Sequence, residues 1–291
     1  MTISNYLKKL IEDKNKLSAI LSDKNINNDN GTFTELIPMV ADVVGSGETI
    51  FKTNSVKFTG FSGTSLQNTL KYIDTSEQSD MSYMFYNCNN ILELDLSRFN
   101  TSKVTTMEYM FSRLCAIQTI NVSSFNTSSV TNMNSMFGYY STSYSDTFRQ
   151  STVALLPGIE NFDTSKVTNM YGMFANCKNL TTLDLSNWDM SNCETTKNMF
   201  YGCLELKSVK LGRTSSILTN VSGMFSACLK LEYIDMRNMD LSAVTQSYIN
   251  NIFNQVPTNC NIVVKDNVAK TLLMQDYPNH NIKTVAELEA E

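Results

Sequence analysis

The chain of 291 residues contains one histidine, His280, one tryptophan, 11 glycines and 4 prolines. Any histidine-based metal site or Ser/Cys-His catalytic system would have to use this one imidazole, which disfavours both kinds of site. No stretch approaches the roughly 18 consecutive apolar residues that a membrane-spanning helix needs. The net charge of −5 disfavours binding to the phosphate backbone of nucleic acids. We therefore expect no enzyme, no cofactor, no metal, no nucleic-acid partner and no membrane insertion.

Methionine, phenylalanine and tyrosine are abundant instead, with 16, 15 and 13 copies. The dipeptide Met-Phe begins at residues 84, 110, 136, 173, 199 and 224, and Ile252-Phe253 is a degenerate seventh copy. Neighbouring positions keep the same phase, with a consensus of MxxMFxxCxxLxxLDLSxFDTSKVTN. A repeat of about 26 residues cannot close a core alone, so it predicts a solenoid of about seven stacked coils.

Each repeat unit combines two periodicities. Residues 170–177 place Met, Met, Phe and Cys at i, i+3, i+4 and i+7, which predicts a short helix. Residues 183–185 alternate apolar and polar side chains, as in a short strand. The Asp/Asn-Thr-Ser triplets, such as residues 163–165, favour a turn. The predicted fold class is an α/β solenoid with a parallel β-sheet and short helices.

One spacing of 37 residues places about eleven extra residues somewhere within residues 139–157. Insertions into a repeat map to loops on one face of the solenoid. This one mixes aromatic side chains with serine and threonine, a composition that suits recognition surfaces. Its candidate ligand-binding residues are Tyr139, Tyr140, Tyr144, Phe148 and Arg149. The alternative is a tolerated surface loop without function.

The predicted sheet presents an outward polar column of Asp95, Asn121, Asp184, Lys210 and Asp235. The three aspartates are candidate ligands for a sugar or a protein. A glycosidase pair of Asp184 and Asp235 is a minor alternative. The two would be two coils apart, roughly 10 Å by strand spacing, slightly beyond the usual separation of such pairs, with Lys210 between them.

Four of the seven cysteines, Cys88, Cys177, Cys203 and Cys228, lie three residues after the repeat phenylalanine. This phase predicts a buried column of structural thiols. No CxxC pair is present, which disfavours zinc. Disulfides are disfavoured because helices of neighbouring coils should lie about 8–10 Å apart, too far for a bridge.

The pattern LxxLDLSxFDTSKVTNMxxMFxxC, clearest at residues 163–189 and 81–107, resembles the leucine-rich-repeat surface proteins of the BspA type. The resemblance covers about residues 73–255. It implies a scaffold that binds host or neighbouring-cell molecules and carries no catalytic chemistry. Two copies depart from the pattern, with MSNCETTKN at 190–198 and GRTSSILTN at 212–220, and we expect local irregularity there.

Residues 1–45 lie outside the repeat. A heptad-like apolar stripe predicts a helix that oligomerises or docks: Ile3, Leu7, Leu10, Leu17 and Leu21. The alternative is an amphipathic helix folded back on a second helix at residues 34–44. Glu12 and Asp13 interrupt any apolar stretch behind Lys8 and Lys9, so no classical export signal is predicted if Met1 begins the natural protein.

The two ends of the repeat, residues 81–255, should be capped. At the N-terminal cap, residues 46–80, the alternation of Phe51, Val56, Phe58 and Phe61 predicts short strands. At the C-terminal cap, residues 256–291, we expect a strand at 262–264, a helix capped by Asp266 that runs to about residue 275, and a strand at 282–284. Capped ends prevent edge pairing.

Both termini resemble phage-encoded structural proteins. Residues 1–44 resemble the leading segment of phage tail and prophage proteins, and residues 261–289 resemble the tail end of phage-encoded repeat proteins. The resemblance implies a virion component of tail, baseplate or fibre type that presents the repeat for host attachment. Its partners would be other virion proteins, a host-surface protein or glycan, and a second copy bound through the N-terminal helix. The alternative is a bacterial cell-surface adhesin.

Overall fold

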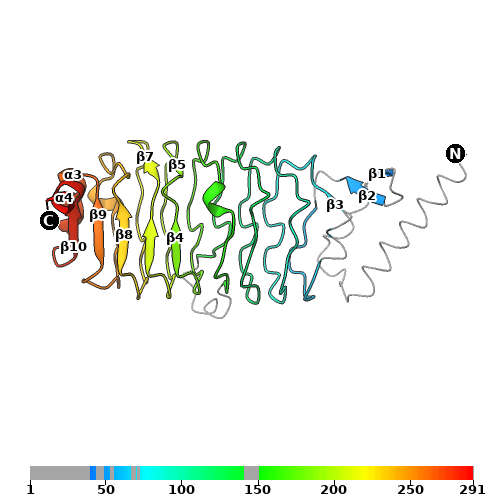
Figure 1. Ribbon diagram of the computed structural model, residues 1–291, viewed down its shortest axis with the longest axis horizontal. Coiled ribbons are helices and arrows are strands. Elements are labelled where there is room, and N and C mark those ends of the chain that lie inside the picture. Colours follow the sequence, from blue (N-terminus) through cyan, green and yellow to red (C-terminus); the bar gives the residue numbers. More distant parts are fainter. Residues whose placement is uncertain are drawn as a thin grey trace, which may run out of the picture.

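The computed structural model describes residues 40–43, 49–52, 56–66, 70, 73–140 and 151–290, with side chains from residue 56 onward. The described chain forms a parallel β-solenoid whose coils stack along one axis (Figure 1). Regular secondary structure is sparse, and most of each coil consists of turns and extended segments. The predicted solenoid and its parallel sheet are confirmed, but little of it is helical.

The longest sheet is formed by parallel strands from successive coils, in the order β10-β9-β8-β6-β4. Their bounds are β4 Thr182–Asp184, β6 Ser208–Lys210, β8 Tyr233–Met236, β9 Asn261–Val264 and β10 Asn281–Thr284. Leu183, Val209, Ile234 and Ile262 pair in register and are buried. Earlier coils keep this stacking through single bridges, such as Thr119 to Leu155. One inward apolar column therefore runs along the sheet.

The two copies that depart from the consensus remain regular, so the expected irregularity is wrong. Strand β5, Asp189–Met190, pairs in parallel with β7, Arg213–Thr214, along one edge of the stack (Figure 1). Met190 replaces the usual threonine and is fully buried. The side chain of Arg213 forms an ion pair with Asp189. Two short 3-10 helices, η4 Ile159–Asn161 and η5 Gln246–Tyr248, lie in other turns.

The Met-Phe segment is a run of turns. Alternate N–H groups, such as that of Met84, donate to the carbonyl three residues back. Tyr83 and Asn87 both have a φ of 60°, as the third residue of a type II turn requires. The N–H groups between them donate to the next coil, as from Phe85 to Met110 at 2.9 Å. Half of the amide donors therefore join one coil to the next.

The predicted helix over residues 170–177 is therefore wrong, although its apolar stripe is buried. Gly172 and Asn176 have φ values of 57° and 59°, which a right-handed helix excludes. A chain of turns that reverses every few residues places the same positions on one face as an α-helix does. Met170, Met173 and Phe174 are fully buried in this arrangement.

The repeat phenylalanines form one continuous column, as the repeat predicts. Consecutive rings are near-parallel, with centroids 5.4–6.0 Å apart. The members are Phe58, Phe85, Phe111, Phe137, Phe174, Phe200, Phe225 and Phe253. A second stack joins Phe125, Phe162 and Trp188. The core is thus a set of ladders in which each side chain packs on its equivalents.

The cysteine column is also confirmed. Cys88, Cys177, Cys203 and Cys228 are buried, and each thiol donates to the carbonyl of the phenylalanine in the preceding coil. Burial raises the pKa of Cys88, Cys177 and Cys228 to about 12. All seven cysteines are free thiols. Helix spacing is not what keeps the cysteines apart, because the segments are not helices. Their coil-to-coil hydrogen bonds bring neighbouring coils closer together than packed helices would lie.

The N-terminal end differs from its prediction. Strand β1, Val40–Val43, pairs antiparallel with β2, Thr49–Lys52, and β2 pairs in parallel with β3, Ile73–Asp74. The predicted helix at 34–44 is therefore wrong for Val40–Val43, whose β-branched valines favour a strand. Phe51 lies in β2. Residues 56–61 form no strand, and Phe58 instead joins the phenylalanine column.

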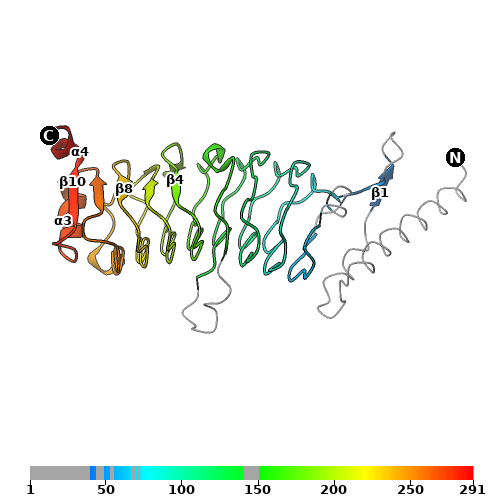
Figure 2. The same ribbon diagram turned by 60° about the horizontal axis from the view of Figure 1, so that its bottom comes forward.

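The C-terminal end matches its prediction (Figure 2). Helix α3, Asn267–Met274, connects β9 to β10 along the chain. The Asp266 carboxylate accepts a hydrogen bond from the Ala269 N–H at the start of this helix. A final helix, α4, Val285–Glu289, begins with a capping box of Thr284 and Glu287. Tyr277 and His280 pack on Phe253 and close the phenylalanine column.

Candidate functional site

Each coil presents two polar sides to solvent. We call the outward residues of β4, β6, β8 and the equivalent segments of other coils the strand side. We call the outward residues of the Met-Phe segments the Met-Phe side. The chain passes from one to the other through the buried Cys-x-x-Leu corner, so the two sides lie on different faces of the solenoid.

The three candidate aspartates lie on the strand side and serve its turns. Asp95, Asp184 and Asp235 each accept a hydrogen bond from the N–H group two residues further on. The carboxylate therefore replaces a backbone acceptor where the strand ends. The predicted register of Asp184, Lys210 and Asp235 is confirmed. These aspartates have a structural role that the sequence analysis did not assign to them.

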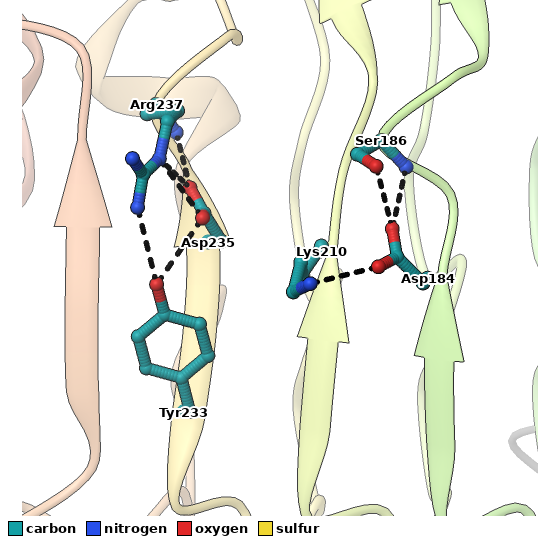
Figure 3. A network of polar contacts seen from close by, with 6 residues as sticks. All are labelled: Asp184, Ser186, Lys210, Tyr233, Asp235 and Arg237. Carbon is teal, nitrogen blue, oxygen red and sulfur yellow. Dashed lines mark hydrogen bonds and ion pairs between the residues drawn. The ribbon is translucent and has the colours of Figure 1, made fainter.

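Asp184 and Asp235 are further held by cations (Figure 3). Lys210 Nζ lies 2.8 Å from Asp184 Oδ2, and its hydrogen bond is the main cause that lowers the pKa of Asp184 to about 2. Both oxygens of Asp235 accept from Arg237 Nε at 2.9 Å, and Tyr233 Oη lies 3.1 Å from Oδ2. A general acid needs a raised pKa, so Asp184 is unsuited to that role.

The Met-Phe side is rich in tyrosine. Tyr83 stacks on Tyr109 with ring centroids 5.0 Å apart, and Tyr86 meets both edge-on. Further along the stack, Tyr140 meets Tyr171 and Tyr201 edge-on, at 6.0 and 4.9 Å. Among the described tyrosines of this side, only Tyr83 and Tyr248, near its two ends, are largely exposed, at 38% and 46%. Aromatic surface thus extends over most of the coils.

Two of the five candidate residues from the insertion fall within the described chain. The Tyr139 ring lies under the guanidinium of Arg113, 3.6 Å from ring centroid to Cζ. Tyr140 belongs to the tyrosine cluster above. The coil resumes at Ser151, which bridges to Cys177. Tyr144, Phe148 and Arg149 lie outside the described residues, as do Ile3, Leu7, Leu10, Leu17 and Leu21 of the N-terminal stripe.

A groove of about 540 Å³ lies on the Met-Phe side and runs across the three successive coils of Phe200, Phe225 and Phe253, with Tyr140 from an earlier coil adding to its lining. Its lining is almost entirely amide, hydroxyl and phenol. It contains Tyr140, Lys197, Asn198, Tyr201, Asn220, Ser222, Gly223, Ser226, Ser247, Tyr248, Asn250, Asn251 and Asn254. Among the described residues that line it, none is a carboxylate and Lys197 is the single cation. A hollow of about 450 Å³ on the strand side is lined partly by leucine and alanine.

Asn198 is the most unusual residue of the groove. Its residue surface is only 4% exposed, yet its Nδ2 atom completes no hydrogen bond with any described residue. Burial raises the pKa of Tyr140 and Tyr171, and the nearby Asn198 side chain opposes this shift. A side chain on Gly223, which has a φ of 63°, would place Cβ 2.2 Å from Asn198 Oδ1. The backbone of the next coil thus leaves room for this amide.

Tyr140 was predicted from the sequence, but the other groove residues were not. Most of these occupy variable positions of the MxxMFxx segment, where no single coil shows a recognisable motif, whereas Asn220 occupies the asparagine of the VTN consensus. The available signal was compositional, because asparagine, serine and tyrosine recur at these positions in successive repeats. No group of three or more His, Cys, Asp or Glu side chains in the described part of the chain is placed to hold a metal ion.

Among the residues that the structure describes, no helix has the length and apolarity to cross a membrane. The fold and its polar sides define a parallel β-solenoid repeat protein. A family model described as "Mycoplasma protein of unknown function, DUF285" matches residues 54–153 and 141–232. These two copies cover more than half of the chain, so the protein belongs to this family. Comparisons with curated proteins and with solved structures find no match.

Proposed function

We propose that the protein is a non-enzymatic recognition scaffold whose Met-Phe side binds a molecule on a cell surface. The observation that carries this proposal is a buried asparagine in the groove, Asn198, whose side-chain Nδ2 has no hydrogen-bond partner among the described residues. On the strand side, by contrast, Asp95, Asp184 and Asp235 are committed to their own turns. Buried polar groups without partners are costly, which favours a site that a ligand completes.

Stacked ladders support this role, because they hold the side chains of several coils in fixed relative positions. Solenoids offer extended surfaces of this kind. Rigid tyrosines with adaptable asparagine and serine neighbours suit recognition at low entropic cost. The BspA-type resemblance of the repeat points in the same direction.

We place the scaffold in a phage virion, where the N-terminal segment would attach or oligomerise and the solenoid would contact the host. This location is supported by the resemblance of both termini to phage structural proteins. Labelled antibody on purified virions, with a mass-spectrometric inventory of the same particles, tests it. Particles that lack the protein would contradict it. Detection on washed cells that carry no prophage would favour the cell-surface adhesin.

Deletion of residues 141–150 tests recognition separately from location. The flanking residues Tyr140 and Ser151 belong to ordered coils, so the deletion should leave the unfolding midpoint nearly unchanged. Binding of the labelled protein to a panel of intact bacterial strains, including the strain that carries the gene, should weaken. Unchanged binding would remove the insertion from the proposed surface.

A further inference from the structure

We infer that the groove on the Met-Phe side binds a short stretch of a neutral, linear glycan. This inference rests on the proposed function, since it names the chemical class of the molecule that the scaffold recognises. It is argued from the lining residues, the buried amide of Asn198 and the direction of the groove along the stack.

The chemistry of the described lining disfavours other classes first. A peptide or protein partner that inserts apolar or basic anchor side chains would find no leucine, isoleucine, valine or carboxylate among the described lining residues. An anionic ligand such as a sialylated or sulfated glycan needs several cations, and Lys197 is the single cation among these residues. An uncharged ligand with many hydroxyl groups remains.

The polar residues match such a ligand. Each asparagine amide offers two donors and an acceptor within one plane, and each serine hydroxyl can donate and accept. Asn220 and Ser222 come from one coil, and Asn250 and Asn254 from the next, so these groups recur along the groove. Asn220 Oδ1 accepts from the Ser222 N–H and Asn250 Nδ2 donates to the Ser247 carbonyl, but an amide can make more than one hydrogen bond, which leaves each group capacity for a ligand. Asn198 adds a buried donor that lacks a partner in the described chain. Adjacent sugar hydroxyls present the complementary donors and acceptors.

Tyrosine rings supply the apolar contacts that a sugar ring also needs. Tyr140 and Tyr201 meet edge-on at 4.9 Å, so their planes are nearly perpendicular and form a corner beside the groove. Tyr248 lies two coils beyond Tyr201 and is 46% exposed. The C–H face of a pyranose packs on such rings while its hydroxyls reach the amides. Because the groove crosses three coils, the geometry favours a linear chain of sugars over a single one.

The test uses the full chain and two tyrosine variants. Wild-type protein is screened on an array of neutral linear oligosaccharides and their sialylated and sulfated counterparts, and hits are titrated by calorimetry. Tyr248→Ala removes an exposed groove ring. Tyr83→Ala is the matched control, because Tyr83 is a similarly exposed tyrosine on the same side but far from the groove. Neither substitution touches the core, so both variants should fold.

We expect binding of at least one neutral oligosaccharide, weakened roughly tenfold or more by Tyr248→Ala and changed by less than about twofold by Tyr83→Ala. A protein that binds no glycan, or only charged ones, overturns the inference. Binding that is insensitive to Tyr248→Ala also overturns it. If no glycan binds but Tyr248→Ala still weakens attachment to cells, the glycan class fails and the recognition scaffold stands.

Discussion

The strand side and the Met-Phe side are built from the same repeat, yet they use their polar groups differently. On the strand side, Asp184 bonds to its own turn and to Lys210 of the next coil. On the Met-Phe side, the backbone satisfies its own amides through turns and coil-to-coil bonds. Some side chains there also serve turns, since Asn220 Oδ1 accepts a hydrogen bond from the Ser222 N–H, but the Asn198 Nδ2 atom has no partner among the described residues. We therefore propose that the strand side serves folding and that the groove on the Met-Phe side serves recognition.

The two sides share one hydrophobic core, and a substitution in this core should have the largest effect on stability. Phe174 is fully buried and stacks on Phe137 and Phe200, at 5.7 and 5.4 Å. Phe174→Ala should lower the free energy of unfolding by about 3–5 kcal/mol. Denaturant unfolding of the variant measures the loss. A loss below about 1 kcal/mol would show that the ladder does not support both sides, and would contradict the coil assignment.

The turns between the two sides should contribute less. Thr101 is buried, and its hydroxyl donates to the Asn126 carbonyl and accepts from the Asn126 N–H, at 2.9 and 2.7 Å. Thr101→Val removes both bonds and should cost about 1–3 kcal/mol, because the N–H and carbonyl groups of Asn126 lose their partner.

Ser102→Ala serves as the control for this turn. Ser102 is exposed and bonds only locally to Asn100. Thermal unfolding of the pair should show a clearly larger loss for Thr101→Val. Equal losses would mean that the coil-to-coil bond adds nothing beyond the local turn.

The smallest effect concerns acid stability on the strand side. The pKa of Asp184 is about 2 in the folded protein, against an ordinary value of 3.8. A lowered carboxyl pKa stabilises the fold above the unfolded value, and this contribution is lost as pH falls from about 4 towards 2. The effect is modest because the Lys210–Asp184 pair is exposed to solvent.

Lys210→Met should reduce this part of the acid sensitivity, because the hydrogen bond from Lys210 is its main cause. Unfolding midpoints measured between pH 5 and pH 2 for wild type and variant provide the comparison. Identical pH profiles would show that the ion pair leaves acid stability unchanged. The described lining of the groove contains no carboxylate, so the groove itself should show no corresponding acid transition.

Much of the fold could be predicted from the sequence because equivalent residues of successive repeats stack on one another. The 26-residue phase of Phe85 and Phe111 required a common column once stacking was assumed. Asp184 and Lys210 were placed opposite each other by the same phase. Asp266 predicted α3, because a local side-chain cap acts within a few residues.

Other features were ambiguous or depended on distant parts of the chain. An i, i+3, i+4, i+7 stripe fits both a helix and a series of turns, and only the residues at positive φ, such as Gly172 and Asn176, distinguish them. The groove depends on side chains from four coils that meet across their boundaries. Its key residue, Asn198, looks unremarkable in the sequence, and only its burial without a hydrogen-bond partner among the described residues draws attention to it.

Attachment of two matched triple variants tests the central claim most directly. One carries Tyr140→Ala, Tyr201→Ala and Tyr248→Ala on the Met-Phe side. The other carries Asp184→Ala, Lys210→Ala and Arg213→Ala on the strand side and its edge. With unfolding midpoints confirming that both are folded, the tyrosine variant should lose binding to the bacterial panel and the charge variant should retain it. Loss confined to the charge variant would contradict the assignment of recognition to the Met-Phe side.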